Sequence, residues 1–189
     1  AVESGWIRAA HTPRALAELH DLARQWQRRG ADTAPLDARE IAELIGTDAY
    51  CGGMIDRRGG NLHPLNYALG LAGAAQKAGA VLHGQSRAMG LEKTAGGYRI
   101  PTAQGTLTAQ KLLLCTNGYT DGLAPPLART VVPVRSVQVA TEPLPASVLE
   151  TLLPGRQAPS DSRRLLLYFR RDAQGRFIMG GRGAYSDNG

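Results

Sequence analysis

The stretch Asp56-Arg57-Arg58-Gly59-Gly60-Asn61-Leu62-His63-Pro64-Leu65 decides the fold that the sequence predicts. Its paired glycines permit a tight backbone turn. Proline is favoured as the first residue of a helix, because the amide that it lacks would have no partner there. Apolar residues then recur at helical spacing as far as Gly79, a typical helix end. The sequence therefore predicts a helix of about four turns that begins at Pro64 and has His63 at its mouth.

Two short apolar runs follow this helix, at residues 80–83 and 111–115. The second run is continuous, which is typical of a parallel strand buried on both faces. The glycine and alanine content of the helix predicts that it packs closely on a sheet. Between the runs, the turn signals Ala95-Gly96-Gly97 and Gly105 predict an antiparallel meander. We therefore expect a helix and parallel-sheet layer with an inserted β-meander.

The flanking segments favour helices and antiparallel strands. Thr12-Pro13 and Asp37 are the predicted helix starts, since threonine and aspartate cap helices and proline opens them. We interpret Pro154 to Ser162 as a polar linker. Strands are predicted at 48–55 and 130–141, a short helix at 146–153, and a hairpin at 165–179. The fold class is therefore mixed α/β, with residues 63–122 in one domain and residues 1–62 and 123–189 paired into a second, antiparallel sheet.

Composition excludes several classes of protein. The formal net charge is +6, but the arginines are scattered in pairs at most and lack interleaved aromatic residues, so we expect no nucleic-acid groove. The two cysteines fit neither a disulfide framework nor a zinc site, and Cys115 is predicted to be buried. No apolar run approaches the roughly 18 residues of a membrane span. We expect a cytoplasmic protein without a metal, and leave its oligomeric state open.

The residues alone point to one ligand site. Cys115-Thr116-Asn117-Gly118 follows the predicted parallel strand, at the edge where open α/β sheets bind ligands, although a plain strand exit is an equal alternative. His63 is interpreted either as a ligand contact or, more simply, as a structural histidine at a turn. The sequence has no GxGxxG turn, P-loop or recognisable catalytic triad. The residues by themselves therefore indicate an α/β chain with a ligand site.

A resemblance carries the interpretation further. The chain resembles the FAD-dependent amine and amino-acid oxidases of the D-amino-acid oxidase superfamily, and within them the gamma-glutamylputrescine oxidase branch. The motifs that carry the resemblance are, in order, Tyr50-Cys51-Gly52-Gly53, the segment from Gly60 to Gly70, Leu114-Cys115-Thr116-Asn117-Gly118-Tyr119, Val132-Pro133-Val134 and Ala140-Thr141-Glu142-Pro143-Leu144.

The resemblance implies a flavoprotein whose FAD-binding and substrate-binding domains are woven from alternating segments. Residues 63–122 would be the middle part of the FAD-binding domain, and 1–62 and 123–189 parts of the substrate-binding domain. The cofactor contacts would come from His63, from Met89 at the adenine end of FAD, and from the small turn Thr116, Asn117 and Gly118. The last hairpin would wall the substrate pocket.

In that hairpin, Tyr168, Arg170 and Arg182 would contact substrate, and Tyr168 and Arg182 are the candidate catalytic residues. Arg182 could hold a carboxylate with two hydrogen bonds or stabilise the charge of reduced flavin. The alternative for each residue is a packing tyrosine or a surface arginine.

The implied reaction is oxidation of the C–N bond of a small amine or amino acid by hydride transfer to FAD, with no strong base required of the protein. Because the family's GxGxxG fingerprint is missing, we expect an internal fragment of such an oxidase that binds FAD weakly and is inactive alone. The alternatives are a dehydrogenase with an acceptor other than oxygen and a non-catalytic ligand-binding module.

Overall fold

The computed structural model describes residues 1–132 and 134–183 of the chain. It divides into two compact units. The first comprises the described parts of Ala1–Ala68 and Arg135–Gly189, and the second comprises those of Leu69–Val134. Each unit is described separately below.

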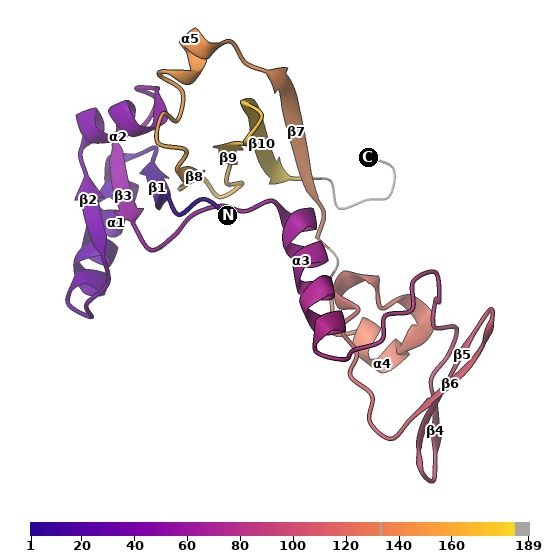
Figure 1. Ribbon diagram of the computed structural model, residues 1–189. Helices are drawn as coiled ribbons and strands as arrows, with labels where there is room; N and C mark the ends of the chain where they lie inside the picture. Colours follow the sequence, from indigo (N-terminus) through magenta and orange to yellow (C-terminus); the bar gives the residue numbers. More distant parts are fainter. Residues whose placement is uncertain (133, 184–189) are drawn as a thin grey trace. The chain divides into compact units, whose positions relative to one another are not determined.

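The first unit is built on a seven-stranded sheet in the order β2-β3-β1-β8-β9-β10-β7 (Figure 1). Its pairs are antiparallel except for β1 with β8, which run parallel. The elements are β1 (Trp6–Ala10), α1 (Pro13–Gln27), β2 (Thr33–Leu36), α2 (Ala38–Ile45), β3 (Gly52–Asp56), β7 (Ser136–Pro143), α5 (Ala146–Leu149), β8 (Ala158–Asp161), β9 (Tyr168–Arg171) and β10 (Arg176–Arg182).

Both predicted helix starts are confirmed. The Thr12 hydroxyl accepts a hydrogen bond from the Ala15 amide at 3.2 Å, and Pro13 is the first residue of α1. Asp37 opens α2 with a reciprocal capping box, in which its carboxylate and that of Glu40 each accept the other's amide at 2.8 Å. These caps satisfy amide groups that the first turn of a helix leaves without partners.

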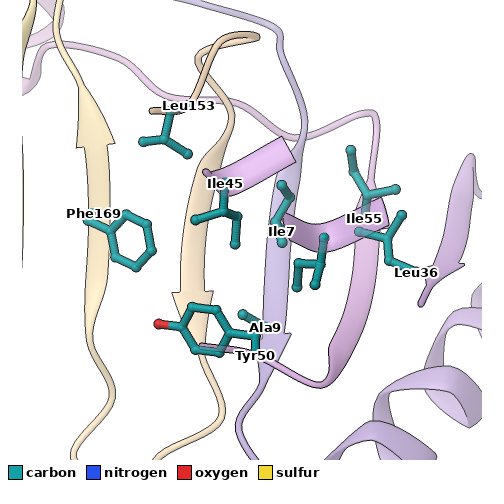
Figure 2. Packing of buried hydrophobic residues seen from close by; sticks show 9 residues of the cluster. Ile7, Ala9, Leu36, Ile45, Tyr50, Ile55, Leu153 and Phe169 are labelled. Carbon is teal, nitrogen blue, oxygen red and sulfur yellow. The ribbon is translucent and has the colours of Figure 1, made fainter. Parts of the chain in front are cut away.

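The two helices cover opposite faces of β1 and β3. Ile7 and Ile55 point into a core cluster that Ile41 and Ile45 of α2 complete, and Figure 2 shows Phe169 and Leu153 converging on the same cluster. The alternate residues Ala10 and Met54 pack instead with Leu19 and Ala23 of α1. Successive side chains on a strand point to opposite faces, so one strand serves both layers.

Beyond β1 the two faces of the sheet differ. Phe169 of β9 and Met179 of β10 pack on the α2 cluster. Their neighbours Tyr168 and Gly180 therefore lie on the opposite face, where α1 packs against β1, β2 and β3. The described residues place no helix over that face of β8, β9 and β10, which leaves an open wall.

The second unit contains the predicted meander, formed by β4 (Glu92–Thr94), β5 (Gly97–Thr102) and β6 (Gly105–Ala109). The chain then forms the 3-10 turns η1 (Asn117–Tyr119) and η2 (Asp121–Leu123) and the short helix α4 (Pro125–Ala128). Helix α3 (Pro64–Lys77) begins at the predicted proline, and the division between the units falls within it. Ile100 is the single buried apolar residue among the described residues of this unit.

The mixed α/β fold class is confirmed, but the two predicted parallel strands are wrong. Residues 80–83 and 111–115 form no strand, Leu113 is 84% exposed, and Cys115 is exposed rather than buried. A strand buried on both faces needs partners for its backbone and cover for its side chains. Within the described residues neither run has a neighbouring strand, so apolar composition alone did not produce one.

The predicted polar linker was also wrong, because residues 158–161 form strand β8. Its pairing with β1 makes the sheet mixed instead of wholly antiparallel. The predicted strand at 130–141 is observed from Ser136 onward as β7, and Pro133 lies outside the described residues. The helix at 146–153 is shortened to α5. Among the described residues, no helix is long and apolar enough to cross a membrane.

Candidate active-site wall and cofactor hollow

The open wall of the first unit carries a hollow of about 150 Å³. Its lining comes from five strands of the sheet. The lining residues are Trp6, Gln138, Ala158, Pro159, Ser160, Tyr168, Phe169, Arg170, Ile178 and Gly180. The predicted substrate residues Tyr168 and Arg170 are therefore brought together in one site.

Strand register explains why these residues share a face. Gly180 of β10 stands opposite both Tyr168 of β9 and Gln138 of β7. Ser160 of β8 also stands opposite Tyr168. Residues directly opposite each other in paired strands project to the same side of the sheet, so a row of side chains crosses the wall.

Trp6 borders the hollow from β1. Its indole N–H donates a hydrogen bond to the Ser160 hydroxyl at 3.1 Å, and the Arg8 guanidinium lies 5.7 Å from the centre of its ring. An indole held by a hydrogen bond and by a cation–π contact loses freedom to rotate. Trp6 therefore forms a fixed aromatic side of the hollow.

Tyr168 borders the hollow from β9. Its phenol forms a hydrogen bond with the Ser136 hydroxyl of β7, two strands away. The ring consequently extends across β10 instead of standing upright from its own strand.

The two predicted arginines differ in their positions. Arg170 lines the hollow and pairs in register with Ile178. Arg182 lies on the same face, opposite Ser136, but is not among the residues that line the hollow. Within the described part of the chain, neither arginine has a carboxylate within ion-pair distance. A free guanidinium is suited to bind a carboxylate ligand.

A buried polar group fixes the end of β8 beside the wall. The Asp161 carboxylate is enclosed, forms an ion pair with Arg163, and accepts the Leu167 amide at 3.0 Å. Its hydrogen bond raises the pKa of Arg163. The guanidinium lies 5.8 Å from the centre of the Tyr50 ring, and burial is the main cause that raises the pKa of the Tyr50 phenol. These contacts hold the strand that carries Ser160.

The second unit has a larger hollow of about 700 Å³. Two loops supply most of its lining, and both carry predicted cofactor residues: Met89 in the first and Thr116 in the second. The lining comprises Gln85, Arg87, Ala88, Met89, Ala103, Thr116, Tyr119, Thr120, Asp121, Gly122 and Leu123. The backbone amide of Met89 donates to the Pro101 carbonyl at 2.8 Å, which ties the first loop to β5.

Hydrogen bonds within the turn at 116–120 shape the second loop. The hydroxyls of Thr116 and Thr120 are 2.7 Å apart, and Thr120 donates to the Asn117 carbonyl at 2.9 Å. Asn117 adopts a left-handed backbone with φ 48°, which asparagine tolerates better than most residues. Asn117 and Gly118 belong to this turn but do not line the hollow.

His63 lies in the first unit and is exposed. Its ring nitrogen Nδ1 accepts the Asn66 amide at 3.3 Å, so it caps the first turn of α3. This contact supports the structural alternative for His63, while a cofactor contact stays a prediction.

The whole chain, residues 1–189, matches the model of the family described as FAD dependent oxidoreductase. The chain belongs to this family. The resemblance found in the sequence motifs is thereby confirmed, and so is FAD as the cofactor of the family.

Relatives of this flavoprotein chain support the same family assignment. The chain is 38% identical over 151 residues to a probable oxidoreductase OrdL of Rhizobium meliloti, a match that covers 80% of this chain and 35% of that protein. It is 31% identical over 179 residues to the gamma-glutamylputrescine oxidoreductase of Escherichia coli, covering 94% of this chain and 42% of the relative. The chain thus spans about two fifths or less of the relatives' length.

Solved structures of an oxidase and a dehydrogenase share the fold. Glycine oxidase from Geobacillus kaustophilus superposes with a TM-score of 0.75 at 19% identity, over 98% of this chain and 50% of that one. L-proline dehydrogenase from P. horikoshii gives 0.77 at 16% identity, over 96% and 49%.

Several residues of the flavoprotein's sheet wall escaped prediction. Trp6, Gln138, Ser160 and Gly180 all line the hollow. The signal for Gln138 and Gly180 was the alternation along β7 and β10. Ser160 was missed because its strand was interpreted as a linker, and Trp6 because its pairing with β8 spans about 150 residues. No group of three or more His, Cys, Asp or Glu side chains suited to a metal occurs among the described residues.

Proposed function

We propose that the protein containing this chain is a flavin-dependent amine or amino-acid oxidase that oxidises a C–N bond of its substrate. The observation that carries the proposal is the open wall, with its aromatic sides and unpaired Arg170, in a chain of the FAD dependent oxidoreductase family. The similarity to gamma-glutamylputrescine oxidoreductase and the shared fold with glycine oxidase and L-proline dehydrogenase support this class of substrate.

The hollow of the second unit fits part of the cofactor. Its volume lies within the ~300–1,000 Å³ range of ligand sites. The hydroxyl groups of Thr116 and Thr120 suit hydrogen bonds to a ribose, and the Met89 thioether and Tyr119 ring suit contact with an adenine. Arg87 adds a cation that suits the phosphates, although Asp121 lies 3.7 Å away. We assign this hollow to the adenosine end of FAD.

The wall of the first unit has the substrate-binding role. Arg170 holds a carboxylate of the substrate, Trp6 and Tyr168 enclose its apolar part, and Ser160 and Gln138 supply polar contacts. Arg182, on the same face outside the hollow, adds to the positive charge of the wall. FAD supplies the acceptor for the hydride that leaves the carbon next to nitrogen. The wall has to orient a neutral amine and exclude water. It requires no strong base, because a neutral amine can give up hydride directly.

Visible absorption tests this function. Purified protein with bound FAD is mixed anaerobically with gamma-glutamylputrescine, glycine or L-proline, and loss of the oxidised flavin bands is the expected result for one of them. Arg170→Ala should raise the KM for that substrate at least tenfold, because a charged hydrogen bond contributes roughly 1.5–3 kcal/mol. Arg176→Ala is the control, since Arg176 is exposed and lines neither hollow.

Two other results would change the assignment. Flavin that is reduced by substrate but not reoxidised by oxygen would indicate a dehydrogenase with another acceptor. Binding of amines without any change in the flavin spectrum would indicate a non-catalytic binding module. We expect the 189-residue chain by itself to bind FAD weakly, because its sequence has no GxGxxG turn to hold the pyrophosphate.

A further inference from the structure

The position of the Tyr168 ring depends on a glycine of the neighbouring strand. Gly180 stands opposite Tyr168 in the β9–β10 pair and is buried. A Cβ atom added to Gly180 would lie 2.6 Å from Cζ and 2.9 Å from the phenol oxygen of Tyr168, and closer still to Cε2. Real Cβ atoms do not approach other atoms so closely. The ring occupies its place because residue 180 has no side chain.

A hydrogen bond holds the ring in that place. Ser136, on the far side of β10, bonds to the Tyr168 phenol. Ser136 thereby fixes the phenol oxygen, while the edge of the ring next to that oxygen (Cε2 and Cζ) lies against Gly180. Strand β10 lies on one side of β9, and β8 and β1 lie on the other. Because the Tyr168 ring lies over β10, it points away from β8 and from Trp6 of β1.

The hollow is the space that this arrangement leaves open. Its lining includes Trp6 of β1, three residues of β8, Tyr168 of β9, and Gly180, Ile178 and Gln138 of β10 and β7. Its volume of about 150 Å³ equals that of an engineered apolar cavity that holds one benzene molecule. A compact apolar group of about six heavy atoms therefore fits. Arg170, which also lines the hollow, can bind a carboxylate attached to that group.

We propose that Gly180 and Ser136 are specificity-determining positioning residues, which hold the Tyr168 ring down and so set the size of the apolar group that the wall accepts next to a carboxylate. This proposal rests on the proposed substrate-binding role of the wall. With a larger residue at position 180 the ring has to leave β10, and we expect it to move into the hollow that it borders.

Fluorescence of Trp6 provides a readout that is independent of flavin and of turnover. The 189-residue chain contains two tryptophans, so Trp26→Phe leaves Trp6 as the only tryptophan of this chain. The probes are acetate, cyclopentanecarboxylate and the neutral cyclopentanecarboxamide, each titrated while Trp6 emission is followed. We expect saturable binding of cyclopentanecarboxylate, and binding of the amide at least tenfold weaker because it lacks the charge that Arg170 holds.

Gly180→Ala should weaken cyclopentanecarboxylate binding at least tenfold and change acetate binding less than twofold. The matched control is Gly181→Ala, on the same strand and the opposite face. Its Cβ meets the nearest atom, Leu167 Cδ2, at an ordinary 3.6 Å, so neither affinity should change. Equal behaviour of the two variants, or loss of both probes to the same extent, would overturn the proposal.

A second pair of variants keeps the test valid if Gly180→Ala does not fold. Ser136→Ala and Tyr168→Phe each remove the hydrogen bond that holds the ring, and each should alter the ratio of the two carboxylate affinities. Ser136→Thr keeps a hydroxyl and should restore the ratio. Unchanged ratios in both would contradict the proposal.

The failure of this inference can be told apart from failure of the proposed function. Size-dependent binding that responds to Gly180→Ala, without flavin reduction by any amine, would leave the inference standing and remove the oxidase. Flavin reduction by an amine, with equal affinities in Gly180→Ala and Gly181→Ala, would leave the oxidase and remove the inference.

Discussion

At the scale of single residues, Asp161 shows how a charge can be placed inside this fold. Its side chain is fully enclosed at the end of β8, where it accepts the amides of Leu167 and Arg163 and pairs with the Arg163 guanidinium. Each oxygen of the carboxylate thus has a partner, which offsets the cost of removing the charge from water. Asp161 fixes the loop between β8 and β9, the two strands that carry Ser160 and Tyr168.

Asp161→Ala should lower the free energy of unfolding by between about 2 and about 5 kcal/mol, because it leaves enclosed donors without an acceptor. Urea denaturation followed by circular dichroism measures the change. Asp32→Ala is the matched control, since the Asp32–Arg57 pair has side chains that are 64% and 52% exposed. Such a pair contributes less than about 1 kcal/mol. Equal losses in the two variants would show that enclosure of Asp161 has no energetic role.

At the scale of elements, α3 differs from the other long helices. Helices α1 and α2 each bury one apolar side, whereas α3 has no buried residue among those described. Leu65, Leu69 and Leu71 are all more than half exposed. The glycines of α3 were interpreted as a sign of close packing, yet nothing lies within 4 Å of a Cβ added at Gly70 or Gly73. In this structure they only lower helix propensity.

Gly70→Ala and Gly73→Ala should therefore each stabilise α3 by up to about 1 kcal/mol, the difference in helix propensity between glycine and alanine. Hydrogen exchange of the α3 amides in the purified chain measures this directly. Ala74→Gly, in the same turn, should have the opposite effect. Slower exchange in the glycine variant than in the alanine variants would mean that α3 packs closely on another surface.

At the scale of the whole molecule, burial is divided unequally between the two units. The first unit has two clusters of buried residues, one on each face of its sheet. In the second unit, the described residues include just Ile100 and Thr120 as buried side chains. Local stability depends on buried apolar contacts, so the second unit should open more easily than the first.

Hydrogen exchange with mass spectrometry should show amides of β4, β5 and β6 exchanging well before those of β1, β3 and β8, which lie beside the α2 cluster. Added FAD should slow exchange in the loops at 85–89 and 116–123 if that hollow holds the adenosine end of the cofactor, since ligand binding stabilises the form that binds it. Uniform exchange across both units would contradict the first expectation. Protection confined to the first unit would contradict the second.

Local signals in the sequence determined a good part of the fold. The capping residues Thr12 and Asp37, the proline that opens α3, and the turn glycines of the meander predicted their elements correctly, because each acts on the backbone within a few residues. Tyr168 and Arg170 were predicted from the resemblance of the last hairpin to a substrate-pocket wall, and the structure brings both to the lining of one hollow, while their contact with substrate stays a prediction. The family motifs predicted membership in the FAD dependent oxidoreductases, which the whole-chain match confirms.

Pairing between distant segments decided what the sequence did not. Strand β8 was predicted as a linker because it becomes a strand through β1, about 150 residues earlier in the chain. The run 111–115 has the composition of a buried strand but lacks a partner among the described residues, so it is not one. The hollow on the wall needs Trp6, Ser160, Tyr168 and Gly180 from four strands. The sequence by itself determined the local elements and the family; tertiary structure alone decided which strands pair and which side chains meet, because backbone hydrogen bonds and close packing depend on residues far away in the chain.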